Sequence, residues 1–310
     1  MTTQSNAVPQ PLESQRNAPA ALSATRPLYW SIRRELWEHR TVYLAPLAAA
    51  AVVMFGFLIS LIRLPHRMPA ILALSPEKQR EALVGPYEVA AGLIMGTAFI
   101  VGFYYCLDAL YAERRDRSIL FWKSLPVSDL TTVLSKASIP VILQLLTVAI
   151  TVATQWIMLL LSTAVLVASG ANVSSLWTQL SLFQMSLMLL YHLLTVHVLW
   201  YAPIYCWLLL VSAWSRRAVF VWAFLPPLAI CVLEKLAFNT SHFVALLKYR
   251  FTGGPEAVTM TASGGFATIN PMTHLTPGAF LISPGLWSGL ALAAVFLAAA
   301  VRLRRYREPI

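Results

Sequence analysis

Two histidines, His192 and His197, are the side chains in this sequence best placed to bind a metal or move a proton within an apolar segment. Ionisable groups at membrane depth are functional candidates. Five residues turn an α-helix by about 500°, or roughly 140° net, so the two rings are predicted to lie on different faces. A two-histidine metal site is therefore not expected. Hydrogen bonding to a neighbouring helix is favoured over contact with a substrate or a proton.

Gln144 and Gln155 are two further polar side chains inside apolar runs. They could line a substrate pathway together with the histidines, or they could hydrogen-bond neighbouring helices, which is the favoured interpretation. The sequence has no GxxxxGK[ST], HExxH or GxSxG pattern, which disfavours nucleotide-phosphate binding and the common metalloprotease and serine-hydrolase layouts. Three cysteines lie in apolar runs without CxxC or Cys/His spacing (Cys106, Cys206 and Cys231). No catalytic residue, metal or cofactor is expected in this chain.

The segment 108–129 combines charge with an apolar cluster. Seven charged residues lie between positions 108 and 123: Asp108, Glu113, Arg114, Arg115, Asp116, Arg117 and Lys123. Burying even one at the bilayer centre costs about 2.5–3.5 kcal/mol, so the segment must leave the membrane. Ile119–Trp122 follow, then Pro126 halts any helix, and Ser128 or Asp129 can cap the next one. This pattern indicates a surface that docks on a cytosolic protein; the alternative is an interfacial helix that touches lipid.

Composition places these residues in a membrane protein. Hydrophobic residues make up 58% of the 310 residues and charged residues 12%, against roughly 25% charged in soluble domains. The net charge of +10 could suggest nucleic-acid binding, but the basic residues form short clusters beside apolar runs. Anionic headgroups and the positive-inside rule explain such clusters, so nucleic acid is not an expected partner.

The apolar runs predict an all-α integral membrane fold with six spans. The predicted spans are about 42–62, 89–107, 139–168, 186–213, 218–233 and 285–301. Residues 1–25 are predicted to be a disordered tail and 26–310 the transmembrane domain. Residues 28–40 are predicted to form a helix in the membrane interface, or else an exposed extension of the first span. Pro203 offers a kink in the fourth span, and Pro226-Pro227 predict a break in the fifth.

Lys and Arg residues give the expected orientation. Sixteen of the 23 fall on the side of the two termini, which predicts that both termini are cytoplasmic in a multi-pass protein. On the other side, 234–284 is predicted to be either a re-entrant segment or an ordinary loop. Gly92 and Gly96 form a GxxxG pair whose face is predicted to pack on another helix.

One stretch resembles a known family. Glu113-Arg-Arg-Asp-Arg-Ser-Ile-Leu120, then Leu125-Pro-Val-Ser128 and Lys136 at the start of a span, resemble the permeases of the type-two ATP-binding-cassette exporter superfamily. In that family a Glu-Arg pair, an apolar segment and a similar Pro turn form the coupling helix between the second and third spans. The coarse layout of interface helix, six spans and basic end is similar over almost the whole chain.

The resemblance implies a half-transporter in a bacterial inner membrane. A second permease copy or paralogue would pair with it, and a separate ATPase subunit would bind ATP and Mg. The residues that would couple to this ATPase are Glu113, Arg114, Arg115, Arg117, Phe121, Trp122 and Pro126. The helix at 28–40 would be the family's elbow helix. The transported substrate does not follow from the motif.

Two other function classes stay open. One is a membrane scaffold or sensor that docks a cytoplasmic partner through the same loop without transport. The other is an intramembrane enzyme using His192, His197 or Glu234, for which no complete catalytic arrangement is visible in the sequence.

Overall fold

The computed structural model describes residues 25–124, 127–171, 173–252 and 277–306. These ranges are helical, with no strand among them, so the all-α prediction is confirmed for this part of the chain. Most of the predicted tail, Pro126 and residues 253–276 lie outside the described residues.

Thirteen helical elements follow one another along the described chain. They are α1 (Thr25–Glu38), α2 (Thr41–Leu72), α3 (Pro76–Arg115), α4 (Ser118–Ser124), α5 (Asp129–Ala168), α6 (Ser174–Gln179), α7 (Leu182–His192), the π-helix η2 (Leu193–Trp200), α8 (Ala202–Trp214), α9 (Val219–Phe238), α10 (His242–Thr252), α11 (Pro277–Ile282) and α12 (Pro284–Tyr306).

Six segments are long and apolar enough to cross a membrane: Thr41–Leu72, Pro76–Arg115, Asp129–Ala168, Ser174–Trp200, Val219–Phe238 and Pro284–Tyr306. Each overlaps one of the six predicted spans. The second and third have 40 residues each, or about 60 Å of helix, which is twice a hydrocarbon core of about 30 Å. The predicted fourth span is divided at Tyr201, and Pro203 is the second residue of α8, which begins directly after this break.

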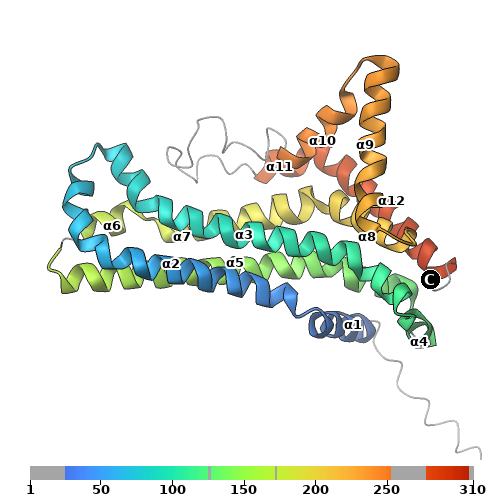
Figure 1. Ribbon diagram of the computed structural model, residues 1–310, viewed down its shortest axis with the longest axis horizontal. Coiled ribbons are helices and arrows are strands. Elements are labelled where there is room, and N and C mark those ends of the chain that lie inside the picture. Colours follow the sequence, from blue (N-terminus) through green and yellow to red (C-terminus); the bar gives the residue numbers. More distant parts are fainter. Residues whose placement is uncertain (1–24, 125–126, 172, 253–276, 307–310) are drawn as a thin grey trace, which may run out of the picture.

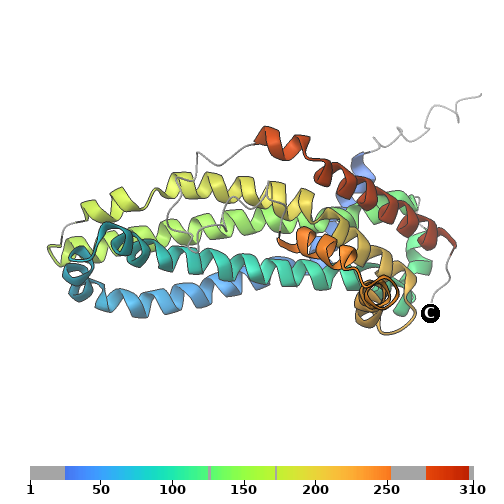
Figure 2. The same cartoon turned by 90° about the horizontal axis from the view of Figure 1, so that it is seen from above.

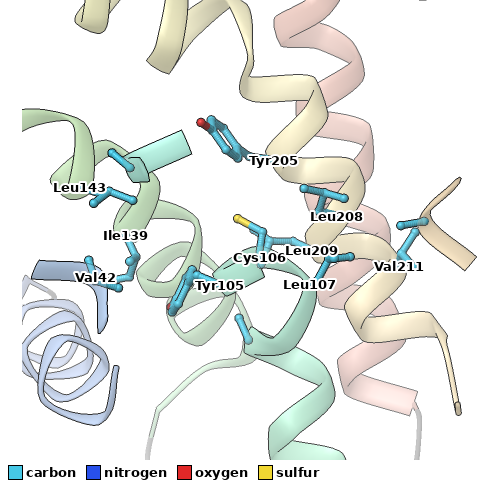
Figure 3. Packing of buried hydrophobic residues seen from close by; sticks show 13 residues of the cluster. Val42, Tyr105, Cys106, Leu107, Ile139, Leu143, Tyr205, Leu208, Leu209 and Val211 are labelled. Carbon is cyan, nitrogen blue, oxygen red and sulfur yellow. The ribbon is translucent and has the colours of Figure 1, made fainter. Parts of the chain in front are cut away.

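The long helices lie side by side as one elongated bundle. α2, α3, α5 and the arm formed by α7, η2 and α8 run along its length, and α12 packs on α8 (Figures 1 and 2). We call the end that carries α1, α4 and the last turns of α12 the charged end. Near it, Val42, Ile139, Leu143 and Leu209 pack around Cys106 (Figure 3). A second apolar cluster, which includes Met68, Leu83 and Leu166, fills the opposite end.

The fifth span is one uninterrupted helix, so the predicted break at Pro226-Pro227 is wrong. α9 and α10 form a hairpin that stands away from the long bundle (Figure 1). A proline at 227 removes the donor that would bond the carbonyl of Ala223 four residues earlier. The Trp207 indole Nε1 on α8 donates to that carbonyl at 3.0 Å instead. A neighbouring helix therefore satisfies the freed acceptor, as occurs in membrane helices that contain proline.

Replacing Trp207 by phenylalanine should lower the free energy of unfolding by about 1–3 kcal/mol, because the Ala223 carbonyl loses its donor while the aromatic contact with Phe296 is kept. Thermal unfolding of the purified chain in detergent measures this change. Trp222→Phe, on an indole ring 39% exposed, is the matched control and should change little. Equal stability of the two variants would show that Trp207 does not support the proline pair.

The Gly92–Gly96 face does not pack on another described helix of this chain, so the helix that this pair is predicted to contact is not among the described ones. Both glycines are exposed, and an added Cβ at either would meet no atom of a neighbouring helix within 4 Å. The packing side of α3 instead includes Gly102, where an added Cβ would lie 3.3 Å from Leu143 and 3.7 Å from Tyr205. Gly102 therefore lies on the face of α3 that packs on other helices, whereas Gly92 and Gly96, which the GxxxG spacing favoured, lie on a different face.

Candidate functional site at the charged end

α4 is a short helix inserted between the two longest helices. α3 ends at Arg115, and Arg117 takes a left-handed conformation (φ 57°), which is uncommon for a residue other than glycine and turns the chain into α4. After α4, the Ser128 hydroxyl accepts a hydrogen bond from the Thr131 amide at 3.1 Å and caps α5. Of the two predicted caps, Ser128 is the one used.

One side of α4 is buried and the other carries exposed apolar side chains. Ile119 is 1% exposed, whereas Leu120 is 58% and Phe121 60% exposed. Arg115, Arg117 and Lys123 are exposed around them. We call these five residues the docking face: Arg115, Arg117, Leu120, Phe121 and Lys123. Arg115 also pairs with the exposed carboxylate of Asp116 at 3.0 Å, so the face carries charge of both signs. An exposed aromatic side chain among charged residues suits a protein surface with an apolar pocket and a charged rim.

Trp122 links α4 to α1. The guanidinium of Arg34 lies over the Trp122 ring at 3.7 Å from its centroid, and the Phe121 ring meets Trp122 edge-on at 4.9 Å. Cation–π pairs contribute about 0.5–2 kcal/mol, depending on how far they are desolvated. The expectation that Trp122 projects towards a partner is therefore revised, since this ring packs against the chain's own arginine.

Arg34 belongs to a buried ion cluster that joins four helices. Its members are Arg34 and Glu35 of α1, Glu113 of α3, Asp129 and Lys136 of α5, and Arg304 of α12. Lys136 Nζ lies 2.9 Å from Glu35 and 3.2 Å from Glu113. Arg304 bridges Glu113 at 3.1 Å and Asp129 at 2.5 Å. Three cations and three carboxylates thus neutralise one another inside the charged end.

Glu35 is the most enclosed carboxylate of the ion cluster. It is 0% exposed and also accepts a hydrogen bond from the Tyr105 hydroxyl at 2.9 Å. Burial raises the pKa of Glu35, but Lys136 and Arg34 together outweigh this and hold the pKa at about 2. The carboxylate is therefore ionised at neutral pH, and its charge depends on the two cations beside it.

Glu113 and Arg114 face into the bundle, contrary to the expectation that they reach a partner protein. Glu113 is 7% and Arg114 3% exposed. Arg114 donates to the carbonyls of Ser212 at 2.7 Å and Ser215 at 2.5 Å, at the end of α8. A cation at a helix C-terminus satisfies otherwise unbonded carbonyls. Because each residue turns the helix by about 100°, Arg115 points outwards while its two predecessors point inwards.

The two histidines are brought together, which corrects the predicted separation. The rings of His192 and His197 lie edge-on with centroids 5.6 Å apart. The cause is η2, because residues five apart lie one above the other in a π-helix, whereas they diverge in an α-helix. His197 also contacts the Tyr201 ring at 5.3 Å. Gln144 and Gln155 are buried on α5, and Gln155 donates to the Tyr87 carbonyl at 3.1 Å.

Sequence reasoning missed most of the ion cluster. Glu35 lies on the side of α1 that carries Ile32 and Leu36, both of which pack on the core. An acidic residue on the apolar face of an amphipathic helix was the available signal for a buried ion pair. Nothing in the local sequence indicates that Lys136 would be its partner, or that Arg304 would pair with Glu113 and Asp129.

Glu35, Glu38 and His39 also approach one another closely enough to hold a metal ion. The geometry alone does not favour a metal ion, because Lys136 and Arg34 already place two positive charges beside the Glu35 carboxylate. An added cation would have to displace an ion pair.

Comparisons with protein-family models, with curated proteins and with solved structures found no match to this chain. Its described part is an all-helical bundle with six helices long and apolar enough to cross a membrane.

Proposed function

We propose that this chain is the membrane-spanning permease subunit of an ATP-driven exporter, coupled through α4 to a separate ATPase subunit. The observation that carries the proposal is the contact of Arg34 with Trp122, because it ties the α4 helix to the ion cluster. A displacement of α4 then acts on α1, α3, α5 and α12 together. The resemblance of residues 113–128 to exporter permeases supports this assignment.

The residues of this chain indicate which steps it would perform and which the ATPase subunit would perform. The chain has no phosphate-binding motif, so ATP and Mg would be held by the partner subunit. The docking face supplies an aromatic anchor and three cations for that contact, while the ion cluster transmits the motion. By the same resemblance a second permease copy or paralogue would complete the complex, and the exposed Gly92–Gly96 face leaves α3 open to it.

The charged end is proposed to face the cytoplasm of a bacterial inner membrane. α3 ends with Arg115 at this end, and Arg216 follows the end of α8 there. The start of α3, with Lys78, and α6, which begins with Ser174, lie at the opposite end of the long helices (Figure 1). Single cysteines at these positions, in a chain lacking its three native cysteines, should label from outside intact cells only at 78 and 174. Labelling of position 115 or 216 from outside would contradict the orientation.

Loss of the Phe121 ring, the aromatic side chain of the docking face, should weaken binding between the permease and the ATPase. Phe121→Ala is expected to weaken binding of the ATPase by about 2 kcal/mol, or roughly 30-fold, because interface energy concentrates in aromatic and arginine anchors. The measurement is the amount of ATP-binding-cassette ATPase recovered per permease, with its ATP turnover in lipid.

Phe183→Ala provides the matched control, since Phe183 is 74% exposed on α7, near the other end of the bundle. It should leave ATPase recovery unchanged. Recovery of a partner without ATPase activity would favour the scaffold or sensor function, and equal recovery with Phe121→Ala would remove α4 from the interface.

A further inference from the structure

A polar stripe runs along the interior of α5. Gln144, Thr151, Gln155 and Ser162 are spaced so that all four lie within a sector of about 40° around the helix. Each is at most 2% exposed. From the first to the last the stripe extends roughly 27 Å, which is close to the thickness of a hydrocarbon core of about 30 Å.

Three polar atoms of this stripe have no hydrogen-bond partner among the described residues: Gln144 Nε2, Thr151 Oγ1 and Gln155 Oε1. Other polar residues of α5 are satisfied by their own helix, since the hydroxyls of Thr147 and Thr154 each donate to a carbonyl four residues earlier at 2.7 Å. An unpaired buried polar group costs about 1–3 kcal/mol, and lipid cannot supply the missing bond. Apolar side chains would pack here at lower cost.

The helices packed against α5 present unpaired polar groups as well. η2 and α8 both contact α5, and His197 Nδ1 and the Tyr205 hydroxyl are buried without a partner. The side chains of Gln144 and Tyr205 are close neighbours. Even so, neither the Gln144 amide nitrogen nor the Tyr205 hydroxyl has a partner at hydrogen-bond geometry. π-Helical turns are rare and recur at functional sites. The stripe also meets α3, where Gln155 donates to the Tyr87 carbonyl and the Ser162 hydroxyl lies 3.5 Å from the Tyr87 hydroxyl. The unpaired groups thus lie along one seam, where α3, η2 and α8 pack on α5.

The stripe contains amides and hydroxyls but no carboxylate, lysine or arginine. The nearest charges along α5 are Lys136 and Asp129, which are engaged in the ion cluster. A charged solute in this seam would leave water without meeting a counter-charge, at high cost. An uncharged solute with donors and acceptors would satisfy the same groups without that cost.

We infer that the seam where α3 and the η2–α8 arm pack on α5 binds and passes an uncharged, hydrogen-bonding solute. The inference rests on the proposed transport function, because it names the class of solute that the permease would carry. Gln144, Thr151 and Gln155 are the residues that would contact it.

Thiol reactivity in the permease alone tests this inference. Thr151→Cys and Gln155→Cys are compared with Leu143→Cys and Ile139→Cys, which replace side chains at most 1% exposed on other faces of α5. All are made without the three native cysteines and studied in lipid vesicles. The probes are methanethiosulfonates with a neutral methyl, a cationic trimethylammonium-ethyl or an anionic sulfonatoethyl group.

The Thr151→Cys and Gln155→Cys thiols should react with the neutral probe at least about tenfold faster than the two controls, because a thiol sealed in apolar surroundings does not ionise. After correction for reactivity with a free thiol, they should also react at least about tenfold faster with the neutral probe than with either charged probe. If one variant does not fold, Ser162→Cys, a near-isosteric change, takes its place.

Rates equal to those of the controls would show that the stripe only joins helices and would overturn the inference. Equal rates with neutral and charged probes would contradict the inference that the solute is uncharged. No ATPase is present, so either result is separate from failure of the ATPase recovery experiment.

Discussion

Replacing Lys136 by methionine is expected to lower the free energy of unfolding by about 3–5 kcal/mol. Lys136 is 1% exposed and pairs with both Glu35 and Glu113. Without it, the Glu35 carboxylate stays buried and loses the cation that does most to keep its pKa low. Since native proteins are stable by about 5–15 kcal/mol, a loss of this size should appear as a lower unfolding temperature and a lower yield of folded chain in detergent.

Lys123→Met is the matched control, because Lys123 is exposed and its amine makes only a 3.4 Å contact with the Arg305 carbonyl. Its effect should stay within about 0.5 kcal/mol. The double variant Glu35→Gln/Lys136→Met removes one charge of each sign and should recover at least half of the lost stability. If Lys136→Met unfolds at the same temperature as Lys123→Met, the ion cluster is not held together by charge.

The parts of this fold that depend on local composition could be predicted. Long apolar runs with few charges are sufficient to place six spans, because each span must satisfy its own backbone in lipid. The α4 segment and its Ser128 cap follow from charge, a proline and a capping residue within 20 residues of sequence. These signals need no knowledge of the neighbouring helices.

The features that sequence reasoning missed depend on partners far along the chain. The ion pair of Glu35 with Lys136 joins positions 101 residues apart, so no local pattern indicates it. The unbroken α9 depends on Trp207 of the preceding helix, and the contact of His192 with His197 depends on a π-helical turn that hydropathy does not distinguish from an α-helix. Helical rotation likewise decides that Glu113 points inwards, which changes its proposed role from docking to transmission.

If the chain has the proposed transport function, Glu113→Gln should separate assembly with the ATPase from coupling to it. Glu113 lies between Lys136, Arg304 and Arg34 at 3.2, 3.1 and 3.6 Å, so it is the carboxylate that connects α3 to α5, α12 and α1. Glutamine keeps the volume but removes the charge, and the helices then move more independently of α4. Recovered ATPase per permease should stay within about twofold of the wild type, because Glu113 is buried and makes no contact across the docking face.

ATP turnover of the assembled complex in lipid is expected to fall at least about tenfold, which corresponds to about 1.4 kcal/mol and is the scale of one charge-assisted hydrogen bond. Glu113→Asp retains the charge and should restore part of this turnover, whereas Glu81→Gln, on the exposed start of α3, should have no effect. A purely structural role predicts a different pattern, in which the unfolding temperature drops while turnover per assembled complex stays normal. That pattern would confine the ion cluster to holding the bundle together, and α4 would then have to transmit motion through Ile119 and its other apolar contacts.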